Sequence, residues 1–401
     1  MNASKHTSVT IDDIREAQKR IAPYLFKTPL SYSHSLSRKL DRDIFIKWDN
    51  KLRTGSFKER GALNFLLQLS PEEKNRGVIA ASAGNHALAV AWHAKQLGIP
   101  CSIVMPTTAP LVKMKTSSSF GAEVSLVGSA LHESYAHALE LADQSGQVFV
   151  PGYDHPHIIA GAGVSGLEIL EDWDDFDAVV VPLGGGGLLA GISRAIRGSG
   201  KDTYLLGVRS QWTKEMGKPK AQFSPAPIAD GIAVKDVGAL PKEIIDSDVN
   251  KVVHVEEKTI ATAITSYLHE ERTVVEGAGA AALAALLEDA LPKQYQRLVL
   301  LACGSNIDLN ILARLIQRSQ FKNGQLLRVR VSVPDRPGSL ARLTQTISEQ
   351  AANVLETYHE RSFSAEPGNV EITFLLETRD EEHKGDLMRS LASSGLHPHE
   401  L

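Results

Sequence analysis

The chain has little cysteine, no long apolar run and no marked excess of charge of one sign. Its 2 cysteines, Cys101 and Cys303, cannot form a disulfide framework, which suits a reducing compartment. No segment approaches the roughly 20 apolar residues of a membrane-spanning helix. The polar start, from Met1 to Thr10, lacks the apolar centre of a signal peptide. We therefore expect a cytoplasmic protein that has no membrane partner.

The charges are nearly balanced, with 43 Lys and Arg against 47 Asp and Glu, and the basic residues are scattered. Such a pattern disfavours nucleic-acid binding and favours a protein that acts on small molecules. No cluster of cysteine, histidine and carboxylate residues has the spacing of a zinc site. We therefore expect neither a nucleic-acid partner nor a metal site.

Strand-like apolar runs alternate with helical patterns along most of the chain, which predicts an α/β fold with a largely parallel sheet. The runs are Val78–Ala81, Ser102–Met105, Val124–Val127, Ala178–Val181, Tyr204–Val208 and Leu298–Ala302. A length of 401 residues predicts two or three domains. Ligands of such sheets bind beyond the carboxyl ends of the strands, where tight turns follow several of these runs.

The composition changes after Ser319. The polar stretch 321–326 is turn-prone and can serve as a linker. The residues that follow, 327–401, predict a small α+β module with strands at Leu327–Val333 and Val370–Leu376 and an amphipathic helix at Ser339–Gln350.

Lys58 is the candidate reactive residue. It lies in a segment rich in small residues, from Thr54 to Ala62, and begins a helix-like stretch. A partly buried lysine at a helix start has a depressed pKa and can attack a carbonyl group. Because most lysines are solvated surface charges, the assignment depends on the turns that accompany it.

A glycine turn follows the strand-like run at 178–182 and consists of Gly184, Gly185, Gly186 and Gly187. Because the turn opens a helix, its backbone N–H groups can converge on a phosphate dianion. The turn lacks the lysine and Ser/Thr of a Walker loop and the spacing of a dinucleotide fingerprint. The alternative is a flexible turn, although four glycines lose much conformational entropy on folding.

Another turn follows Val78–Ala81 and consists of Ser82, Ala83, Gly84, Asn85 and His86. Its amides suit a substrate carboxylate, and the Asn85 side chain can donate to a phenolate oxygen. A plain helix N-cap at Ser82 or Asn85 is an equal alternative, and His86 can be structural. Cys303 ends the last strand-like run, where its thiol can face a pyridine nitrogen or simply pack in the core.

These motifs, in this order, resemble those of the threonine/serine dehydratases, or threonine ammonia-lyases, of the fold-type II pyridoxal-phosphate family. The resemblance covers residues 10–320. It implies a two-domain, tryptophan synthase β-like α/β core with pyridoxal 5'-phosphate as cofactor. The large domain would comprise 1–52 and 159–320, and the small domain 53–158.

The resemblance also implies roles for the residues quoted above. Lys58 would be the Schiff-base lysine and general base, Phe57 would stack near the ring, and Asn85 would bind the ring hydroxyl. Ser82, Ala83, Gly84, Asn85 and His86 would hold the substrate carboxylate; Gly184, Gly185, Gly186, Gly187 and Leu188 would hold the phosphate; Cys303 would meet the pyridine nitrogen. Gly231 and Glu276, in the segments Asp230–Ala233 and Glu276–Gly279, would line the substrate site.

The chain departs from its relatives at three positions. Related serine racemases have a second serine where this chain has Ala83, and alanine cannot deliver a proton to the opposite face of the substrate. Arg209 stands where relatives with a divalent-cation site have an acid, which argues against a bound metal. Leu88 replaces a common glutamine, with no clear consequence.

The tail resembles an ACT domain, an α+β module that binds amino acids. The similarity is carried by Val333 and Pro334 and by the proposed regulatory residues Asp335, Arg336, Pro337, Gly338, Ser339 and Leu340. It implies an amino-acid effector, allosteric regulation and paired modules, and hence a homodimer or homotetramer. The alternative is a dimerisation unit without a ligand.

Together the resemblances predict dehydration and deamination of L-threonine to 2-oxobutanoate and ammonia, with L-serine to pyruvate as a side reaction. Such an activity belongs to amino-acid metabolism, either isoleucine biosynthesis or threonine breakdown. The alternatives are a serine racemase or hydroxyaspartate dehydratase, a cysteine synthase-like β-replacement enzyme, and a catalytically inactive amino-acid sensor.

Overall fold

The computed structural model describes residues 8–216, 227–361 and 368–401. It divides into two compact units, Met1–Ile307 and Asp308–Leu401, which are considered separately below. The linker expected at 321–326 lies later in the chain than this division. In the structure, helix α13 (Leu309–Lys322) contacts strand β11 (Leu326–Pro334), so those residues turn the chain inside the second unit.

The larger sheet of the first unit has six strands in the order β1-β2-β10-β7-β8-β9. The strands are β1 (Leu30–Tyr32), β2 (Asp43–Lys47), β7 (Ala178–Pro182), β8 (Tyr204–Ser210), β9 (Lys251–Val255) and β10 (Arg297–Leu301). All neighbours are parallel except β1 and β2. Every residue of β7 is buried, as expected for a parallel strand whose sheet is covered on both faces.

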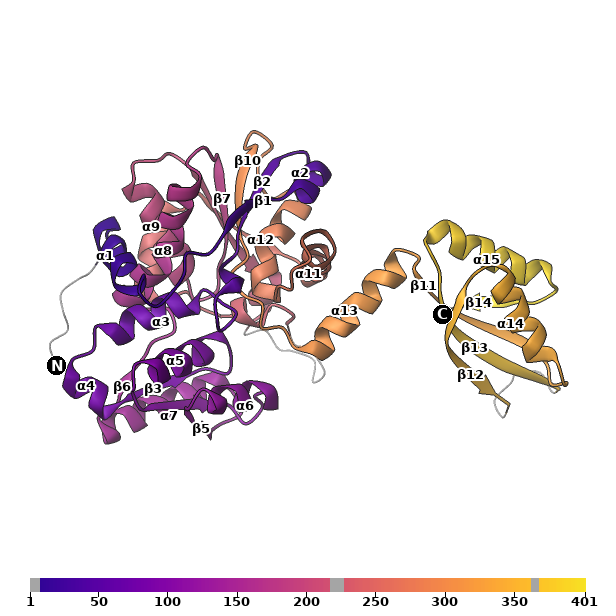
Figure 1. The fold of residues 1–401 in the computed structure, drawn as a ribbon, viewed down its shortest axis with the longest axis horizontal. Coiled ribbons are helices and arrows are strands. Elements are labelled where there is room, and N and C mark those ends of the chain that lie inside the picture. Colours follow the sequence, from indigo (N-terminus) through magenta and orange to yellow (C-terminus); the bar gives the residue numbers. More distant parts are fainter. Residues whose placement is uncertain (1–7, 217–226, 362–367) are drawn as a thin grey trace. The chain divides into compact units, whose positions relative to one another are not determined.

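Helices cover both faces of this sheet, with α8 and α9 on one side of β7 and α11 and α12 on the other (Figure 1). The helices around the larger sheet are α1 (Ile11–Ile21), α2 (His34–Leu40), α8 (Pro156–Asp172), α9 (Gly187–Gly198), α10 (Ala239–Asp248), α11 (Glu257–Glu271) and α12 (Gly277–Leu287), with the short 3-10 turns η1 (Asp49–Lys51), η2 (Gln211–Glu215) and η3 (Asp230–Ile232).

The smaller sheet of the first unit is fully parallel and has the order β5-β4-β3-β6. Its strands are β3 (Val78–Ala81), β4 (Cys101–Met105), β5 (Glu123–Leu126) and β6 (Val148–Phe149), and the helices near it are α3 (Lys58–Leu67), α4 (Pro71–Arg76), α5 (Asn85–Gln96), α6 (Leu111–Ser119) and α7 (Leu131–Ser145). Helices α5 and α7 pack directly on β3 and β4. The strands β3 and β7 both end at turns that enter helices, and these turns form the site described below.

The six strand-like runs predicted from the sequence all correspond to strands, namely β3, β4, β5, β7, β8 and β10. Strands β1, β2, β6 and β9 were not predicted. Strand β2 begins and ends with charged residues, β6 has two residues, and β9 carries exposed side chains at its start, so none shows a clear apolar run.

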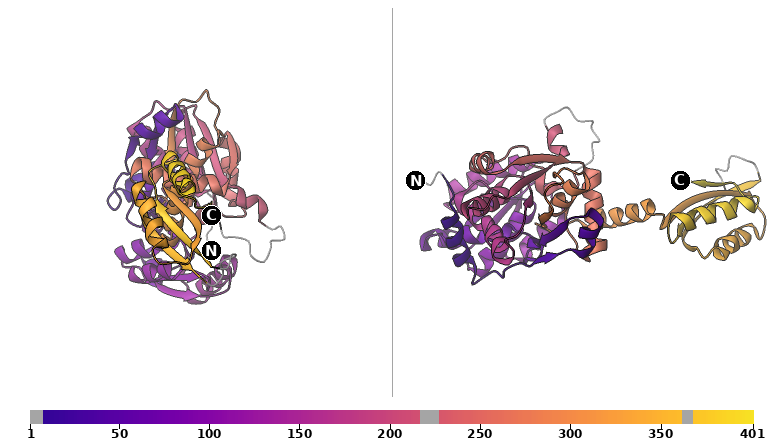
Figure 2. Two further views of the ribbon diagram at one scale, coloured as in Figure 1. Left: turned by 90° about the vertical axis from the view of Figure 1, so that its right-hand side faces the viewer. Right: turned by 90° about the horizontal axis from the view of Figure 1, so that it is seen from above.

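The second unit contains a four-stranded antiparallel sheet in the order β12-β13-β11-β14. Besides α13 and β11 it comprises α14 (Ser339–Glu349), β12 (Asn353–Glu360), β13 (Asn369–Glu377), α15 (Glu381–Ser393) and β14 (Pro398–Glu400). Alternate residues of β11 and β13 are buried against α14 and α15, which lie on one face of the sheet (Figure 2). The predicted elements of the tail are therefore present, and β12, α15 and β14 are additional.

Among the described helices, none combines the length and the apolar composition that a membrane span requires.

Candidate functional site

A cavity of about 330 Å³ lies in the first unit, where turns that follow strands of both sheets meet. It is lined by every residue proposed from the sequence for the cofactor and substrate: Phe57, Lys58, Ser82, Ala83, Gly84, Asn85, His86, Gly184, Gly185, Gly186, Gly187, Leu188, Gly231, Glu276 and Cys303. Residues that are far apart in the sequence, from Phe57 to Cys303, therefore line one cavity. Their individual roles stay predictions.

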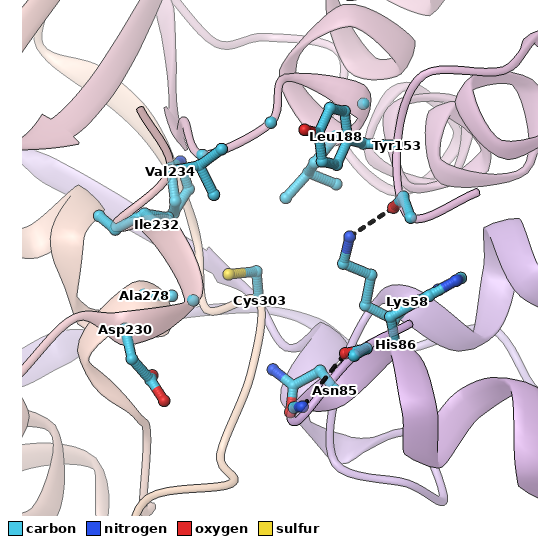
Figure 3. A pocket seen from close by; sticks show the side chains of 18 of the residues that line it. Lys58, Asn85, His86, Tyr153, Leu188, Asp230, Ile232, Val234, Ala278 and Cys303 are labelled. Atoms are coloured by element: carbon cyan, nitrogen blue, oxygen red, sulfur yellow. Dashed lines mark hydrogen bonds between the residues drawn. The ribbon is translucent and has the colours of Figure 1, made fainter. Parts of the chain in front are cut away.

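Lys58 begins helix α3, and its Nζ donates to the carbonyl oxygen of Gly152 at 2.6 Å (Figure 3). Burial lowers the pKa of Lys58 to about 8, against the smaller opposing effects of Cys303 and Glu276. Near neutral pH, a useful fraction of this amine is unprotonated. Lys58 is therefore chemically suited to attack a carbonyl carbon.

The turn from Ser82 to His86 joins β3 to α5. The N-cap of α5 is Gly84, and it has no side-chain capping bond; the Ser82 Oγ instead accepts from Gly84 N at 3.1 Å. The alternative in which Ser82 or Asn85 is a plain N-cap is thus wrong, and the helix start lacks side-chain capping. The N–H groups at the start of α5 have no side-chain acceptor, and their partial positive charge suits the binding of a carboxylate.

His86 lies in the cavity wall but is held by the protein. Its Nε2 lies 3.0 Å from the Val150 carbonyl oxygen, and burial, together with nearby Lys58, lowers its pKa to about 4. The ring is therefore neutral at physiological pH. This geometry agrees with the structural alternative for His86.

The glycine turn joins β7 to α9. Gly186 adopts a φ of 101°, in the left-handed region that favours glycine, and helix α9 has no side-chain cap. A Cβ at Gly185 would overlap the ring of Tyr153, and a Cβ at Gly184 would lie 2.9 Å from the carbonyl oxygen of Gly231. Close packing thus excludes side chains here, and the N–H groups that open α9 are left for an anion.

Cys303 is 2% exposed and lines the cavity just after β10. Its carbonyl oxygen accepts from Phe57 N at 3.0 Å, which ties the segment carrying Lys58 to the end of the larger sheet. Burial raises the pKa of the thiol well above its usual value, so the sulfur is a neutral S–H group. Figure 3 shows Cys303 across from Lys58, with its sulfur turned toward Ile232 and Ala278.

Glu276 is buried beside the Asn85 amide, whose Nδ2 donates to Glu276 Oε1 at 2.6 Å. Burial, with a contribution from Asp230, raises the pKa of Glu276 to about 7. The carboxyl group can therefore change its protonation state near neutral pH.

Several cavity residues were not singled out from the sequence. Tyr153 and Gly152 follow β6, a strand too short to predict, and Lys113 comes from α6. Asn306 donates a hydrogen bond to Asn85. The only indication of this in the sequence is its position three residues after Cys303. Tyr153, Gly152 and Lys113 reach the site through tertiary packing, and their local sequence gives no indication of it.

The proposed regulatory residues, 335–340, lie in the second unit and are not part of this cavity. Residues 335–338 join β11 to α14, residues 339 and 340 begin α14, and Gly338 has a φ of 92°. Arg209 donates to the carbonyl oxygens of Val234 and Lys235. Across the described ranges, no group of three or more metal-binding side chains comes together.

The residues present fit pyridoxal 5'-phosphate chemically. The cavity has an amine with a lowered pKa for the aldehyde, a glycine turn at a helix start for the phosphate, and a neutral thiol for a pyridine nitrogen. Its volume is also in the range of small-molecule sites.

Two curated relatives match nearly the whole chain, and both are named L-threonine ammonia-lyase. The protein from Thermotoga maritima is 41% identical over 96% of this chain and 98% of its own length. The protein from Geobacter sulfurreducens is 39% identical, over 95% of this chain and 97% of its own length.

Solved structures agree with these matches. Threonine deaminase isoform 2 from Solanum lycopersicum has a TM-score of 0.68 and 32% identity, covering 78% of this chain and 94% of its own. Maize serine racemase has a TM-score of 0.71 and 29% identity, covering 79% of this chain and 99% of its own.

The family model described as pyridoxal-phosphate dependent enzyme matches residues 21–304, which is more than half of the 401 residues and includes every residue of the cavity. The chain therefore belongs to the family of pyridoxal-phosphate dependent enzymes.

Proposed function

We propose that this chain is an L-threonine ammonia-lyase that forms 2-oxobutanoate and ammonia, and that it converts L-serine to pyruvate more slowly. The observation that carries the proposal is the position of Lys58 in one cavity with the glycine turn and Cys303. The names of the curated relatives support it.

When bound, the cofactor would supply an aldehyde that joins amines covalently and a ring that withdraws electrons from the substrate Cα. Lys58, displaced by the substrate amine, would take the proton from Cα. The Cα proton and the Cβ hydroxyl group would together leave as water. The released enamine would then take up water to give the 2-oxo acid and ammonia.

Anion binding by helix starts supports this assignment of the substrate and cofactor. The open start of α9 suits the phosphate, and the open start of α5, with the turn from Ser82 to His86, suits the substrate carboxylate. These two anions would lie on elements from different sheets, and Lys58 would act between them.

The neutral thiol of Cys303 favours elimination over racemisation. A thiol with a raised pKa does not protonate a pyridine nitrogen, so the ring would withdraw electrons less strongly and a long-lived carbanion would be disfavoured. Ala83 adds to this, because a methyl group cannot deliver a proton. A serine racemase function is therefore the weaker candidate.

The charges at the cavity support a substrate with one carboxylate. Lys113 lines the cavity, but its Nζ is paired with Asp230 Oδ2 at 3.1 Å. A second carboxylate, as in hydroxyaspartate, would have to displace this partner. Threonine and serine carry no such group.

The proposal extends to the organisation of the chain. Residues 53–158 would form a small domain against a large one at 1–52 and 159–307, where the first unit ends. The tail from 327 would be an ACT-like regulatory module, with an amino-acid effector near residues 335–340. The enzyme would work in the cytoplasm as a homodimer or homotetramer.

Product analysis of the purified holoenzyme tests the activity. We expect 2-oxobutanoate and ammonia in equal amounts from L-threonine, and loss of turnover in Lys58→Ala. The matched control, Lys19→Ala, changes a lysine that is 72% exposed on α1 and should keep full activity. Turnover only with an added thiol would favour a β-replacement enzyme, and no turnover with retained amino-acid binding would favour a sensor.

A further inference from the structure

Hydrogen bonds connect the side chains of Asn306, Asn85 and Glu276 beside the cavity. A main-chain carbonyl group determines which of their atoms donate and which accept. Asn306 Nδ2 donates to the carbonyl oxygen of Thr54 at 2.7 Å. A carbonyl oxygen can only accept, so the atom of Asn306 that faces it must be the amide nitrogen. The orientation of the Asn306 amide follows from this contact alone.

The same nitrogen determines how the next amide lies. Asn306 Nδ2 is 2.7 Å from Asn85 Oδ1, and Asn85 Nδ2 is 2.6 Å from Glu276 Oε1. Because the Asn306 nitrogen is a donor, the Asn85 atom next to it must be the oxygen. The Asn85 nitrogen therefore faces Glu276 and the cavity.

Asn306 also holds the other end of this network. Its backbone N–H donates to the carboxyl group of Glu276, and the neighbouring Ser305 N donates to the Gly55 carbonyl oxygen at 2.8 Å. A Cβ at Gly55 would lie 2.8 Å from Asn306 Oδ1, so glycine at position 55 is what leaves room for this side chain.

We infer that Asn306 is a positioning residue, which orients the Asn85 amide so that it can offer a bound cofactor only a hydrogen-bond donor. The Asn85 nitrogen has two hydrogens and Glu276 accepts one of them, which leaves the second for a ligand. The inference rests on the proposal that Asn85 faces the ring hydroxyl. It requires that the ring oxygen accepts this hydrogen bond in its ionised form.

Reversing the polarity of residue 306 tests this inference. In Asn306→Asp the carboxylate is an acceptor, so the Asn85 amide would turn its nitrogen to residue 306 and its oxygen toward the cavity. The ring oxygen would then favour its neutral form. Since one hydrogen bond contributes about 1 kcal/mol, we expect the absorbance ratio of neutral to ionised ring oxygen to rise about fivefold.

The measurements are the visible spectrum of the holoenzyme across pH and the affinity of the apoenzyme for pyridoxal phosphate. Asn306→Ala, which removes the donor without adding a charge, should shift the spectrum in the same direction by less. The matched control is Ser305→Ala. It removes side-chain hydrogen bonds to the carbonyl oxygens of Asn50 and Gly55, and neither of these bonds involves Asn85.

An unchanged spectrum in both Asn306 variants would overturn the inference, and so would an equal shift in Ser305→Ala, since that indicates general loosening of the segment. Threonine turnover by the unaltered enzyme is measured in parallel. A spectral shift without wild-type turnover would leave the inference standing and refute the proposed activity, whereas turnover without the shift would do the reverse.

Discussion

At the scale of single residues, Lys58 is followed by two buried charged residues that hold the main chain in place. Glu59 accepts from Thr54 N and lies 3.0 Å from His93 Nε2, while Arg60 pairs with Asp49 and Glu168 at 2.8 and 2.7 Å. Both neighbours are completely buried. The reactive amine therefore extends from a backbone with little freedom, which favours a constant distance to the cofactor.

The lowered pKa of Lys58 predicts the pH dependence of cofactor capture. Only the neutral amine attacks the aldehyde, so the rate of reconstitution of the apoenzyme should rise with pH and level off above about 8. Stopped-flow absorbance measures this rate. Nα-acetyl-lysine, measured alongside, should show a rate that still increases up to about pH 10; a protein profile that follows it would contradict the assignment.

The Lys113–Asp230 ion pair predicts a change in substrate preference. In Asp230→Asn the lysine loses its partner and can bind a second carboxylate, so kcat/KM for 3-hydroxyaspartate relative to threonine should rise. One charge-assisted hydrogen bond corresponds to about tenfold. The double variant Asp230→Asn, Lys113→Met should lose this gain, and a gain that persists there would show that Lys113 is not responsible.

At the scale of elements, a buried ion network joins helix α3, which Lys58 begins, to three other segments. Lys47 of β2, Asp49 of η1, Arg60 of α3 and Glu168 of α8 are all at most 5% exposed. Lys47 Nζ donates to Glu168 Oε2 at 2.6 Å, and Thr28 Oγ1 donates to Asp49 Oδ1 at 2.7 Å. Two positive and two negative charges balance there, so each is costly to remove alone.

Glu168→Gln would leave the network with an excess positive charge. We expect the free energy of unfolding to fall by about 3–5 kcal/mol, because the charges of Lys47 and Arg60 would stay buried with one partner fewer. Urea denaturation measures the change. The same substitution at Glu16, whose ion pair with Lys19 is exposed, should cost less than about 1 kcal/mol; equal losses at both sites would refute the role of burial.

At the scale of the whole molecule, the two compact units should unfold separately. The cavity lies entirely in Met1–Ile307, and Asp308–Leu401 has its own apolar core. Calorimetry of the full chain should show two transitions, and pyridoxal phosphate should raise the midpoint temperature of only one of them. Cofactor at a hundred times its dissociation constant should add about 2.7 kcal/mol to that transition.

Phe374→Ala provides the reciprocal change. Phe374 is completely buried in the core of the second unit, so its loss should destabilise that unit by about 3–5 kcal/mol and leave the cofactor-sensitive transition in place. A single transition that shifts as a whole with either change would contradict independent unfolding.

The sequence predicted the cavity residues well because each is part of a local motif. A buried apolar run followed by a glycine-containing turn and a helix is recognisable within about twenty residues, as at Val78–His86 and Ala178–Leu188. The short or charged strands β2 and β6 were missed, since their burial depends on what packs against them. Tyr153, which follows β6, was missed with it, and Lys113 of α6 was missed because nothing in its local sequence marks it.

By itself, the amino-acid sequence determined the α/β alternation and marked Lys58 and the two glycine-containing turns as candidates for the site, because these features depend on near neighbours in the chain. Only the tertiary structure decided that Asn306 orients Asn85 from 221 residues away, that Asp230 neutralises Lys113, and that Glu168 balances Lys47 and Arg60. Hydrogen bonds and ion pairs depend on distance and direction in space. Residues far apart in the chain acquire both only when the sheets and helices pack.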